Sequence, residues 1–379
     1  MSSGFFEHII NAGKKPLAVT GQEEMRFMNS ILQYVQWRGD LSFYASPVCP
    51  VDALIFSELV HAPFEKAEGA TGSLKYMRSL IFPVTHPEEK GSMNAYRREL
   101  WDGMDCYPRF ARAGLVLFSH SFDEEREMQF AAALFTAGDT GVVVFRGTDG
   151  SLVGWKEDLN MSFCEVPSQT EAARFLSLAA ERAAELGLKR LILCGHSKGG
   201  NLAMFAAARA DAATREKIEK IYCFDAPGLS DKMMAGEGWN SVKDKVVAYV
   251  PESSVIGLLL GNCENRHIVD SDSVSIWQHN PFKWHVMGCD LVEAEGLTLS
   301  SRVIDRTIDE FLKKYPPEKR CVLVNALYEA LKATGADSIK ELPAAVLLHM
   351  KEVRQVLNES LPEGEGAEIW KLLLSALKG

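Results

Sequence analysis

Hydrophobic and polar positions first alternate over short distances in the middle of the chain. Three apolar stretches, at residues 114–120, 128–136 and 141–145, are separated only by the polar segments FDEER and AGDT. Their length and their content of β-branched and aromatic residues are typical of strands. Because the spacers are so short, we expect three consecutive strands that pair with one another in antiparallel fashion.

A longer alternation follows, in which strand-like and helix-like patterns take turns. Residues 169–186 and 198–210 have helical patterns, whereas residues 191–194 and 218–224 are short apolar runs. Strands separated by helices of this length predict right-handed crossovers and a parallel sheet. Two more strand candidates, at 245–250 and 266–269, complete the sheet. The fold class we expect is α/β, with a mostly parallel central sheet flanked by helices.

The flanking regions have different patterns. Residues 22–65 carry apolar residues at helical spacing with a break near Gly39. Residues 66–112 mix glycine, proline and charge, which indicates an irregular or partly helical excursion over the surface rather than a sheet strand. Amphipathic stripes recur after Leu297. We therefore divide the chain into N-terminal helical and irregular elements (1–112), an α/β core (113–290) and a C-terminal helical region (291–379).

Composition narrows the class of protein. The chain has 379 residues, 47% of them hydrophobic and 24% charged, which is the balance of a soluble globular protein. A net charge of −10 without a basic patch argues against a nucleic-acid partner. The eight cysteines lack metal-site spacing, and the first residues lack the apolar stretch of a signal peptide. We expect a cytoplasmic protein with no metal and no cofactor.

The strongest chemical signal is the segment LILCGHSKGGNLAMFAA, in which an apolar strand runs through a sharp turn into an alanine-rich helix. A serine hydroxyl needs such a turn to be held beside a base and an oxyanion site. We therefore take Ser197 as the candidate nucleophile, with Gly195 and Gly199 supplying the small side chains that a nucleophile elbow demands. His196 within the elbow is expected to pack or to position rather than to react. The alternative is a glycine-rich turn of an ordinary βα unit.

An oxyanion hole needs two hydrogen-bond donors near this serine. The backbone N–H of Lys198 starts the helix after the elbow and is one candidate. The second comes from VVVFRGTDG, where glycine allows a turn at the end of a strand, and the N–H or the hydroxyl of Thr148 is the candidate. Alternatively, this segment is a polar β-turn in which Arg146 and Asp149 pair.

The combination of FRGT on one strand end with GHSKGG on a later one resembles the class 3 lipases of the α/β-hydrolase superfamily. In that family a tryptophan and an aspartate follow the first motif, and Trp155 and Asp158 match them here. A wider set of motifs resembles a bacterial family of lipase-like proteins without an assigned function: QYVQWRGDLSF, FRGTDGSLVGWKEDLNMSF, GHSKGGNLA, FDAPGLS and IWQHNPFKW. The resemblance implies the α/β-hydrolase fold and the hydrolase class, but no substrate.

A catalytic triad in this fold follows the chain order serine, acid, histidine. Four histidines lie beyond the elbow, and His279 is favoured because it falls in a loop-like stretch after the last strand. His285 is held in reserve. As an isolated histidine near tryptophans, His279 could equally be a packed loop residue.

Two carboxylates compete for the acid. The resemblance implies an aspartate after the strand VVAYVP, but the stretch VVAYVPESSVIG has serines there, so Glu252 is slightly favoured. Asp225, at the end of the strand YCFD, is the close alternative, since the end of a parallel strand also faces the active-site edge. Either carboxylate could instead cap a helix or pair with Arg146.

The function expected is acyl transfer to water through an acyl-enzyme on Ser197, and the resemblance suggests a carboxylic ester of a lipid or acyl chain as the substrate class. Three alternatives stay open: thioester or amide cleavage by the same machinery, a catalytically silent binding or scaffold protein on this fold, and a membrane-surface lipase with a helical lid. The expected partner is a small-molecule or lipid ester, with transient contact to a membrane surface left open. The sequence pattern does not indicate which oligomeric state the protein has.

Overall fold

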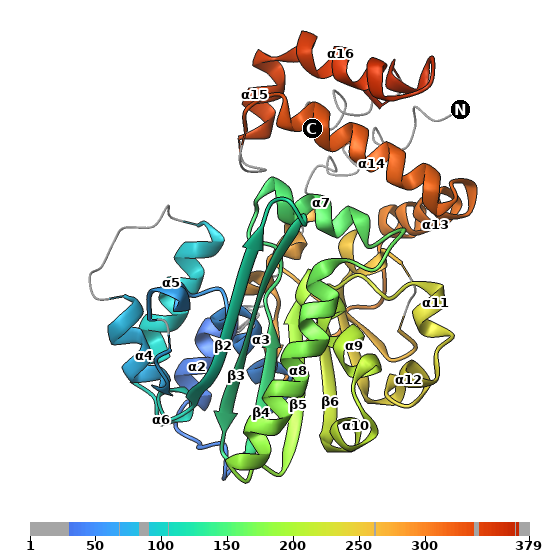
Figure 1. Ribbon diagram of the computed structural model, residues 1–379. Helices are drawn as coiled ribbons and strands as arrows, with labels where there is room; N and C mark the ends of the chain where they lie inside the picture. The colour runs from blue at the N-terminus through green and yellow to red at the C-terminus, as the bar shows by residue number, and fades with distance from the viewer. Residues whose placement is uncertain are drawn as a thin grey trace.

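The computed structural model describes residues 30–67, 69–82, 91–104, 106–260, 263–336, 341–367 and 369–370. Its centre is an eight-stranded sheet in which the strand order follows the chain, from β1 to β8 (Figure 1). The strands are β1 (Gly72–Ser73), β2 (Gly114–Asp123), β3 (Met128–Ala137), β4 (Thr140–Phe145), β5 (Arg190–His196), β6 (Ile218–Phe224), β7 (Val246–Pro251) and β8 (Arg266–Val269).

The pairing changes from antiparallel to parallel at β4. Strands β2, β3 and β4 pair as an antiparallel meander, and β4 to β8 are parallel to one another. Both halves confirm the sequence prediction, because short polar spacers permit only hairpins and long helical spacers permit crossovers. The carboxyl ends of β4, β5, β6 and β7 therefore meet at one edge of the sheet.

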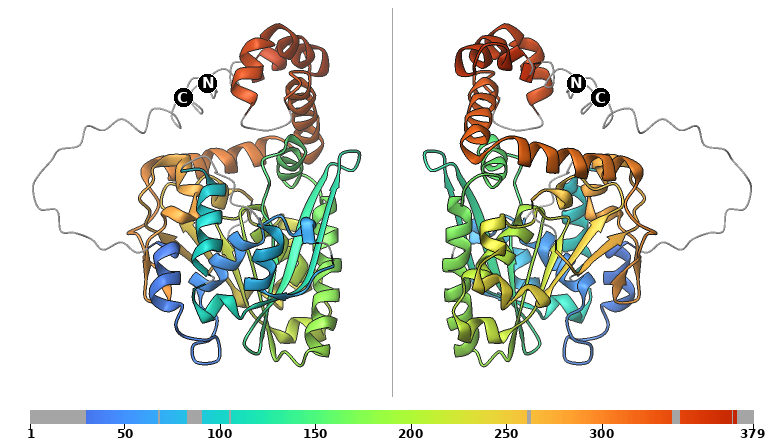
Figure 2. Two further views of the ribbon diagram at one scale, coloured as in Figure 1. Left: turned by 90° about the vertical axis from the view of Figure 1, so that its left-hand side faces the viewer. Right: turned by 90° about the vertical axis from the view of Figure 1, so that its right-hand side faces the viewer.

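Helices cover both faces of the sheet, as Figure 2 shows. Strand β4 illustrates why: Val142 and Val144 belong to the apolar core on one face, and Val143 and Phe145 to the core on the other. One face packs against α2 (Ile31–Arg38) and α3 (Pro50–Leu59), and the opposite face against α8 (Pro167–Glu185) and α9 (Lys198–Arg209). A strand buried on both sides has no polar alternation, as its sequence shows.

Residues 66–112 differ in part from the prediction. They form α4 (Leu74–Ile81), α5 (Met93–Met104) and α6 (Pro108–Ala111), whose apolar residues are buried in the same core as α3. The two residues of β1 also pair with β2, so the expectation that this region adds no strand was wrong. This region contributes to the core because it carries apolar side chains at helical spacing. The glycine, proline and charged residues between them made the region look irregular in the sequence.

The C-terminal region is helical, as predicted. It comprises α13 (Leu299–Lys314), α14 (Pro317–Lys332), α15 (Leu342–Leu348) and α16 (Met350–Ser360), and α14 and α16 share a small apolar core of their own. Figure 1 shows α14 lying across α7 (Leu152–Asn160), where the Lys156 ammonium sits 4.3 Å from the centre of the Tyr328 ring. The predicted division at residues 112 and 291 stays a prediction.

The remaining elements are short. They are α10 (Ala212–Lys217), α11 (Asp231–Met234), α12 (Glu237–Asn240), the two-stranded pair β9 (Val286–Met287) and β10 (Asp290–Leu291), and five 3₁₀ turns: Phe64–Ala67, Lys243–Lys245, Ile256–Leu258, Ser275–His279 and Pro281–Lys283. In the described part of the chain, no helix has the length and apolar character needed to cross a bilayer. The helical pattern predicted at residues 22–29 lies outside the described residues.

Candidate active site

Ser197 occupies the turn between β5 and α9. Its backbone has φ 57° and ψ −133°, a region that a residue with a side chain rarely adopts. The Ser197 N–H donates to the carbonyl oxygen of Phe224 on the neighbouring strand at 2.9 Å. The strained turn therefore holds the serine at the edge where the parallel strands end.

The glycines on either side make this turn sterically feasible. A Cβ on Gly195 would lie 2.2 Å from the Gly199 carbonyl carbon, and a Cβ on Gly199 would lie 2.1 Å from the oxygen of Phe145. Neither contact is tolerable, so any larger residue would force β5, α9 and β4 apart. This is the close approach of strand and helix that the sequence predicted.

The turn after β4 packs directly against the elbow. A Cβ on Gly147, the residue before Thr148, would lie 2.7 Å from the His196 carbonyl oxygen and 3.4 Å from the Ser197 Cβ. The Thr148 hydroxyl donates to Asp158 Oδ2 at 2.5 Å. Because that proton is engaged, the structure leaves the Thr148 N–H, rather than its hydroxyl, free to serve as a donor.

Asp158 has an unusual protonation equilibrium. Burial raises its pKa to about 6, although the positive charge of Lys198 and the hydrogen bond from Thr148 act in the opposite direction. Trp155 and Asp158 both lie on α7, the helix that follows the Thr148 turn. Asp158 thus links this turn to α7.

His279 and Asp225 are in direct contact. The Nδ1 atom of His279 lies 2.6 Å from Asp225 Oδ2, and the imidazole keeps 32% of its side-chain surface exposed. Its ring lies against the ring of His196, with 4.5 Å between the ring centres, and His196 immediately precedes Ser197. The structure therefore brings Ser197, His279 and Asp225 to one edge of the sheet.

Asp225 is held in a fixed orientation at the end of β6. Its backbone has a positive φ of 42°, and its Oδ1 atom accepts hydrogen bonds from the Ser254 hydroxyl at 2.5 Å and from the Gly257 N–H at 3.0 Å. Ser254 is one of the two serines after β7, close to the place where the resemblance implied an aspartate. The carboxylate that contacts His279 therefore comes from the end of β6, and the loop after β7 contributes Ser254, which donates a hydrogen bond to it.

Glu252, which the sequence slightly favoured as the acid, does not contact His279. Its carboxylate lies 3.4 Å from the Gln278 side-chain nitrogen, and its backbone oxygen accepts from the Thr298 N–H. The Glu252 carboxylate thus reaches Gln278, the residue before His279, whereas the His279 imidazole is paired with Asp225. Asp225 reaches the histidine because β6 is the direct neighbour of β5.

The reserve histidine is engaged elsewhere. His285 is buried, with Nδ1 2.9 Å from Asp270 and Nε2 2.9 Å from Asp272. Both ring nitrogens therefore face carboxylates of a neighbouring loop. His285 thus stabilises that loop, and His279 is the histidine downstream of the elbow that lies beside it.

Sequence reasoning missed a buried polar group beneath the site. Glu58 of α3 is fully buried, accepts from Arg97 Nε at 2.8 Å and lies 3.1 Å from His196 Nδ1. Burial raises the pKa of Glu58, but Arg97 and then His196 and His61 outweigh it, so the pKa lies well below its ordinary value. Burial, followed by the nearby His279, lowers the pKa of His196, which favours the neutral ring. The available signal was a glutamate near the end of the mostly apolar helix PVDALIFSEL.

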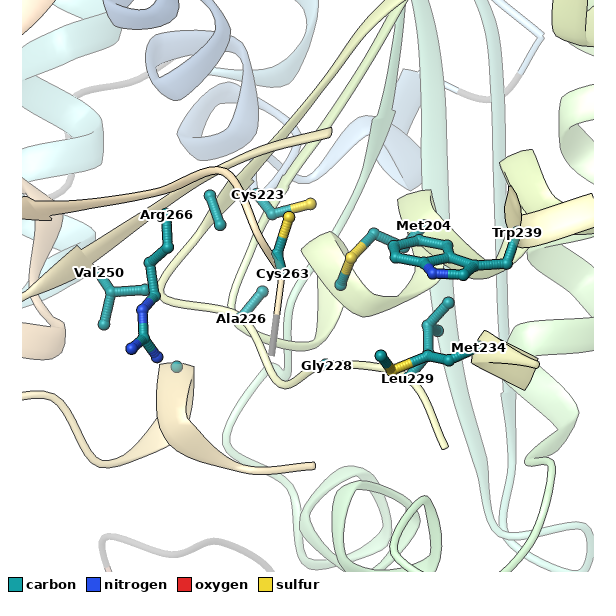
Figure 3. Close-up of a pocket in the computed structure, with 12 residues that line it drawn as sticks. Met204, Cys223, Ala226, Gly228, Leu229, Met234, Trp239, Val250, Cys263 and Arg266 are labelled. Atoms are coloured by element: carbon teal, nitrogen blue, oxygen red, sulfur yellow. The ribbon is translucent and has the colours of Figure 1, made fainter. Parts of the chain in front are cut away.

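The described residues contain no candidate metal cluster, and the cavity that borders Ala226 and Gly257 is small. Over the described ranges, no cluster of three or more histidine, cysteine or acidic side chains could hold a metal ion. A cavity of about 20 Å³ is lined by Met204, Trp239 and Ala226, the residue after Asp225 (Figure 3). It has room for about one water molecule, so it is too small for an acyl chain. Nor does the Ser197 hydroxyl hydrogen-bond to another described residue.

The fold and this edge of the sheet define a lipase-like α/β-hydrolase. The chain belongs to the Mbeg1-like family, whose model matches residues 104–329. Among solved structures, it is similar to the Rhizomucor miehei lipase propeptide complex at 14% identity, covering 66% of this chain and 76% of that one with a TM-score of 0.38. It is also similar to a mutant of MDLA from Penicillium cyclopium at 10% identity, covering 66% and 87% with a TM-score of 0.38. No curated protein matches the chain in sequence.

Proposed function

We propose that the protein is a serine hydrolase that cleaves a carboxylic ester of a lipid or acyl chain through an acyl-enzyme on Ser197. The observation that supports this most strongly is the combination of a serine in a strained strand-to-helix turn with a histidine whose Nδ1 lies 2.6 Å from a buried aspartate. Nucleophile, base and orienting acid are the three parts that acyl transfer requires.

In the proposed reaction, the Ser197 oxygen attacks the ester carbonyl while His279 Nε2 takes the hydroxyl proton. Asp225 accepts the Nδ1–H of His279, which keeps Nε2 as the basic nitrogen and stabilises the imidazolium. The imidazolium then gives its proton to the departing alcohol. A water molecule repeats the sequence on the acyl-enzyme, and the acid product leaves with Ser197 restored.

The oxyanion would be stabilised by two backbone donors. The Lys198 N–H is the first of α9 and has no acceptor within that helix. It also carries the positive end of the helix dipole, which favours a developing negative charge. The Thr148 N–H is the second, since its hydroxyl is engaged with Asp158.

A panel of chromogenic acyl esters of increasing chain length, with matched thioesters and amides, tests this proposal. We expect turnover of at least one ester series and a loss of about 10³-fold or more in Ser197→Ala. The matched control is Ser177→Ala, because Ser177 is an exposed serine of α8 that bonds only its own helix. Thioester or amide turnover without ester turnover would change the substrate class, and full activity in Ser197→Ala would contradict the mechanism.

A folded wild-type protein that turns over none of these compounds would favour the silent scaffold. Vesicle flotation at matched protein concentration would show separately whether the protein contacts a lipid surface.

A further inference from the structure

Lys198 directly follows the proposed nucleophile, yet its side chain does not point to solvent. It is 1% exposed, and its ammonium donates to the Gln129 backbone oxygen at 2.8 Å, to Gln129 Oε1 at 3.0 Å and to Glu157 Oε2 at 3.0 Å. All three hydrogens of the ammonium therefore have acceptors. Lysine is almost never fully buried without such pairing. A charged group held so completely next to the nucleophile is therefore a candidate for a role in the site.

Glu157, the partner of Lys198, joins several elements. The carboxylate is fully buried, its Oε2 atom also accepts from the Gln129 N–H at 3.0 Å, and its Oε1 atom accepts from the Ser168 N–H at 2.9 Å. One ion pair thus connects the start of α9 with β3, α7 and the first turn of α8. A network in which each member is satisfied is rigid.

The next residue of α7 extends this connection to the oxyanion turn. Asp158 accepts the Thr148 hydroxyl, and its Oδ1 atom lies 3.8 Å from the Lys198 ammonium. Lys198 therefore carries one proposed oxyanion donor in its own backbone. Its side chain pairs with Glu157 of α7, and Asp158 of the same helix holds the turn that carries the other donor, the Thr148 N–H.

We propose that Lys198 is a positioning residue whose buried ammonium sets the spacing between the two oxyanion donors, its own N–H and the N–H of Thr148. This inference rests on the proposed function. The two donors come from loops after different strands, and a site of this kind must be held within about 0.5 Å to be effective. A rigid link between the loops meets that requirement.

The same ammonium also acts on the charge of Asp158. The groups that influence this carboxylate are Lys198 of α9, the Thr148 hydroxyl, Glu157 of α7 and His279 of the 3₁₀ turn, and Lys198 is the strongest influence that favours the ionised form. An ionised Asp158 is the better acceptor for the Thr148 hydroxyl. Without Lys198, Asp158 would take up its proton at a higher pH. As the pH falls, the hydrogen bond that holds the Thr148 turn would therefore weaken earlier than in wild type.

The test compares Lys198→Met, the double variant Lys198→Met/Glu157→Gln and Lys198→Arg. Methionine keeps the length of the side chain, the double variant avoids an unpaired buried carboxylate, and arginine restores the charge. Lys156→Met is the matched control, because Lys156 is also a buried lysine of this region but pairs with Glu127 and not with the site. Folding is checked by circular dichroism, and kcat, KM and their pH dependence are measured on the best ester.

We expect kcat to fall about 10²-fold in Lys198→Met and in the double variant, with little change in KM, as for loss of one oxyanion donor. In Lys198→Met the acidic limb of the kcat profile should move up by about one pH unit, and by less in the double variant, because Glu157 raises the pKa of Asp158. Lys198→Arg should recover part of the rate, and Lys156→Met should match wild type. A folded double variant with wild-type kcat and an unshifted profile would overturn the inference while leaving the proposed function intact. An inactive wild type would overturn both.

Discussion

His279 Nδ1 and Asp225 Oδ2 lie 2.6 Å apart although 54 residues separate them in the chain. The contact joins the 3₁₀ turn that follows β8 to the end of β6, and two further donors, from Ser254 and Gly257, hold the carboxylate in place. A carboxylate fixed in this way can orient an imidazole through one tautomer. The proposed catalysis by Ser197 depends on this pair.

Replacing the two competing acids separately tests which one orients His279. Asp225→Asn keeps the size of the side chain but removes the charge and permits the wrong tautomer, so we expect kcat to fall by about 10³-fold or more. Glu252→Gln should change kcat by less than about threefold, because Glu252 contacts Gln278 and not the histidine. Steady-state kinetics on one ester measures both. A large loss in Glu252→Gln with a mild effect of Asp225→Asn would restore the original preference.

Gly257 provides an indirect test of the same carboxylate. A Cβ at this position would lie 2.6 Å from Asp225 Oδ1 and 3.0 Å from Val250, so alanine must displace Asp225 or the loop. We expect Gly257→Ala to lower kcat at least about tenfold through misplacement of the histidine. Gly103→Ala on α5 is the control, since nothing lies within 4 Å of its added Cβ, and it should leave the rate unchanged. Equal kinetics in the two variants would argue against a fixed Asp225.

Asp158 should make folding stability depend on pH in a distinctive direction. Its pKa is raised to about 6 from 3.8, so its contribution to stability is present below about pH 4 and is lost as pH rises through about 6. Relative to Asp158→Asn, wild type should therefore lose about 2–3 kcal/mol of unfolding free energy between pH 4 and pH 7. Urea unfolding at both pH values measures this. The exposed Asp40→Asn is the control, and a parallel pH dependence in wild type and Asp158→Asn would refute the prediction.

Glu58 should make folding stability depend on pH in the opposite direction, with stability lost toward acid. Its pKa is held well below the ordinary value by Arg97 and His196 despite burial, so its contribution is full above about pH 4.5 and declines as pH falls further. Glu58→Gln should cost about 3 kcal/mol at pH 7, because it leaves Arg97 without its buried partner, and the difference from wild type should narrow in acid. Denaturant unfolding against the exposed control Glu65→Gln checks this. An undiminished difference at pH 3.5 would contradict the assignment of the charge.

The fold could be predicted from the sequence because its signals are local. Polar spacers of four or five residues and helices between apolar runs determine which strands pair, and the strands from β2 to β8 appear where the pattern placed them. The elbow is equally local, since Gly195 and Gly199 must be glycine for steric reasons visible in the motif. The two residues of β1 are too few to leave a pattern.

The acid of the site could not be predicted in the same way. The choice between Glu252 and Asp225 depends on which way each side chain points after its strand ends, and a single backbone rotation reverses that direction. The resemblance to class 3 lipases indicated the loop after β7, which contributes Ser254 instead. Similarly, the sequence indicated a role for the backbone of Lys198 but not where its side chain goes, because Glu157 and Gln129 are distant in the chain.

The most direct test of the central claim is labelling of the intact protein with a fluorophosphonate, followed by mass measurement and mapping of the modified peptide. We predict one adduct, on Ser197, that is absent from a folded Ser197→Ala variant and forms much more slowly in Asp225→Asn. A folded wild-type protein that takes up no label, or takes it up at another serine, would contradict the claim that Ser197 is an activated nucleophile.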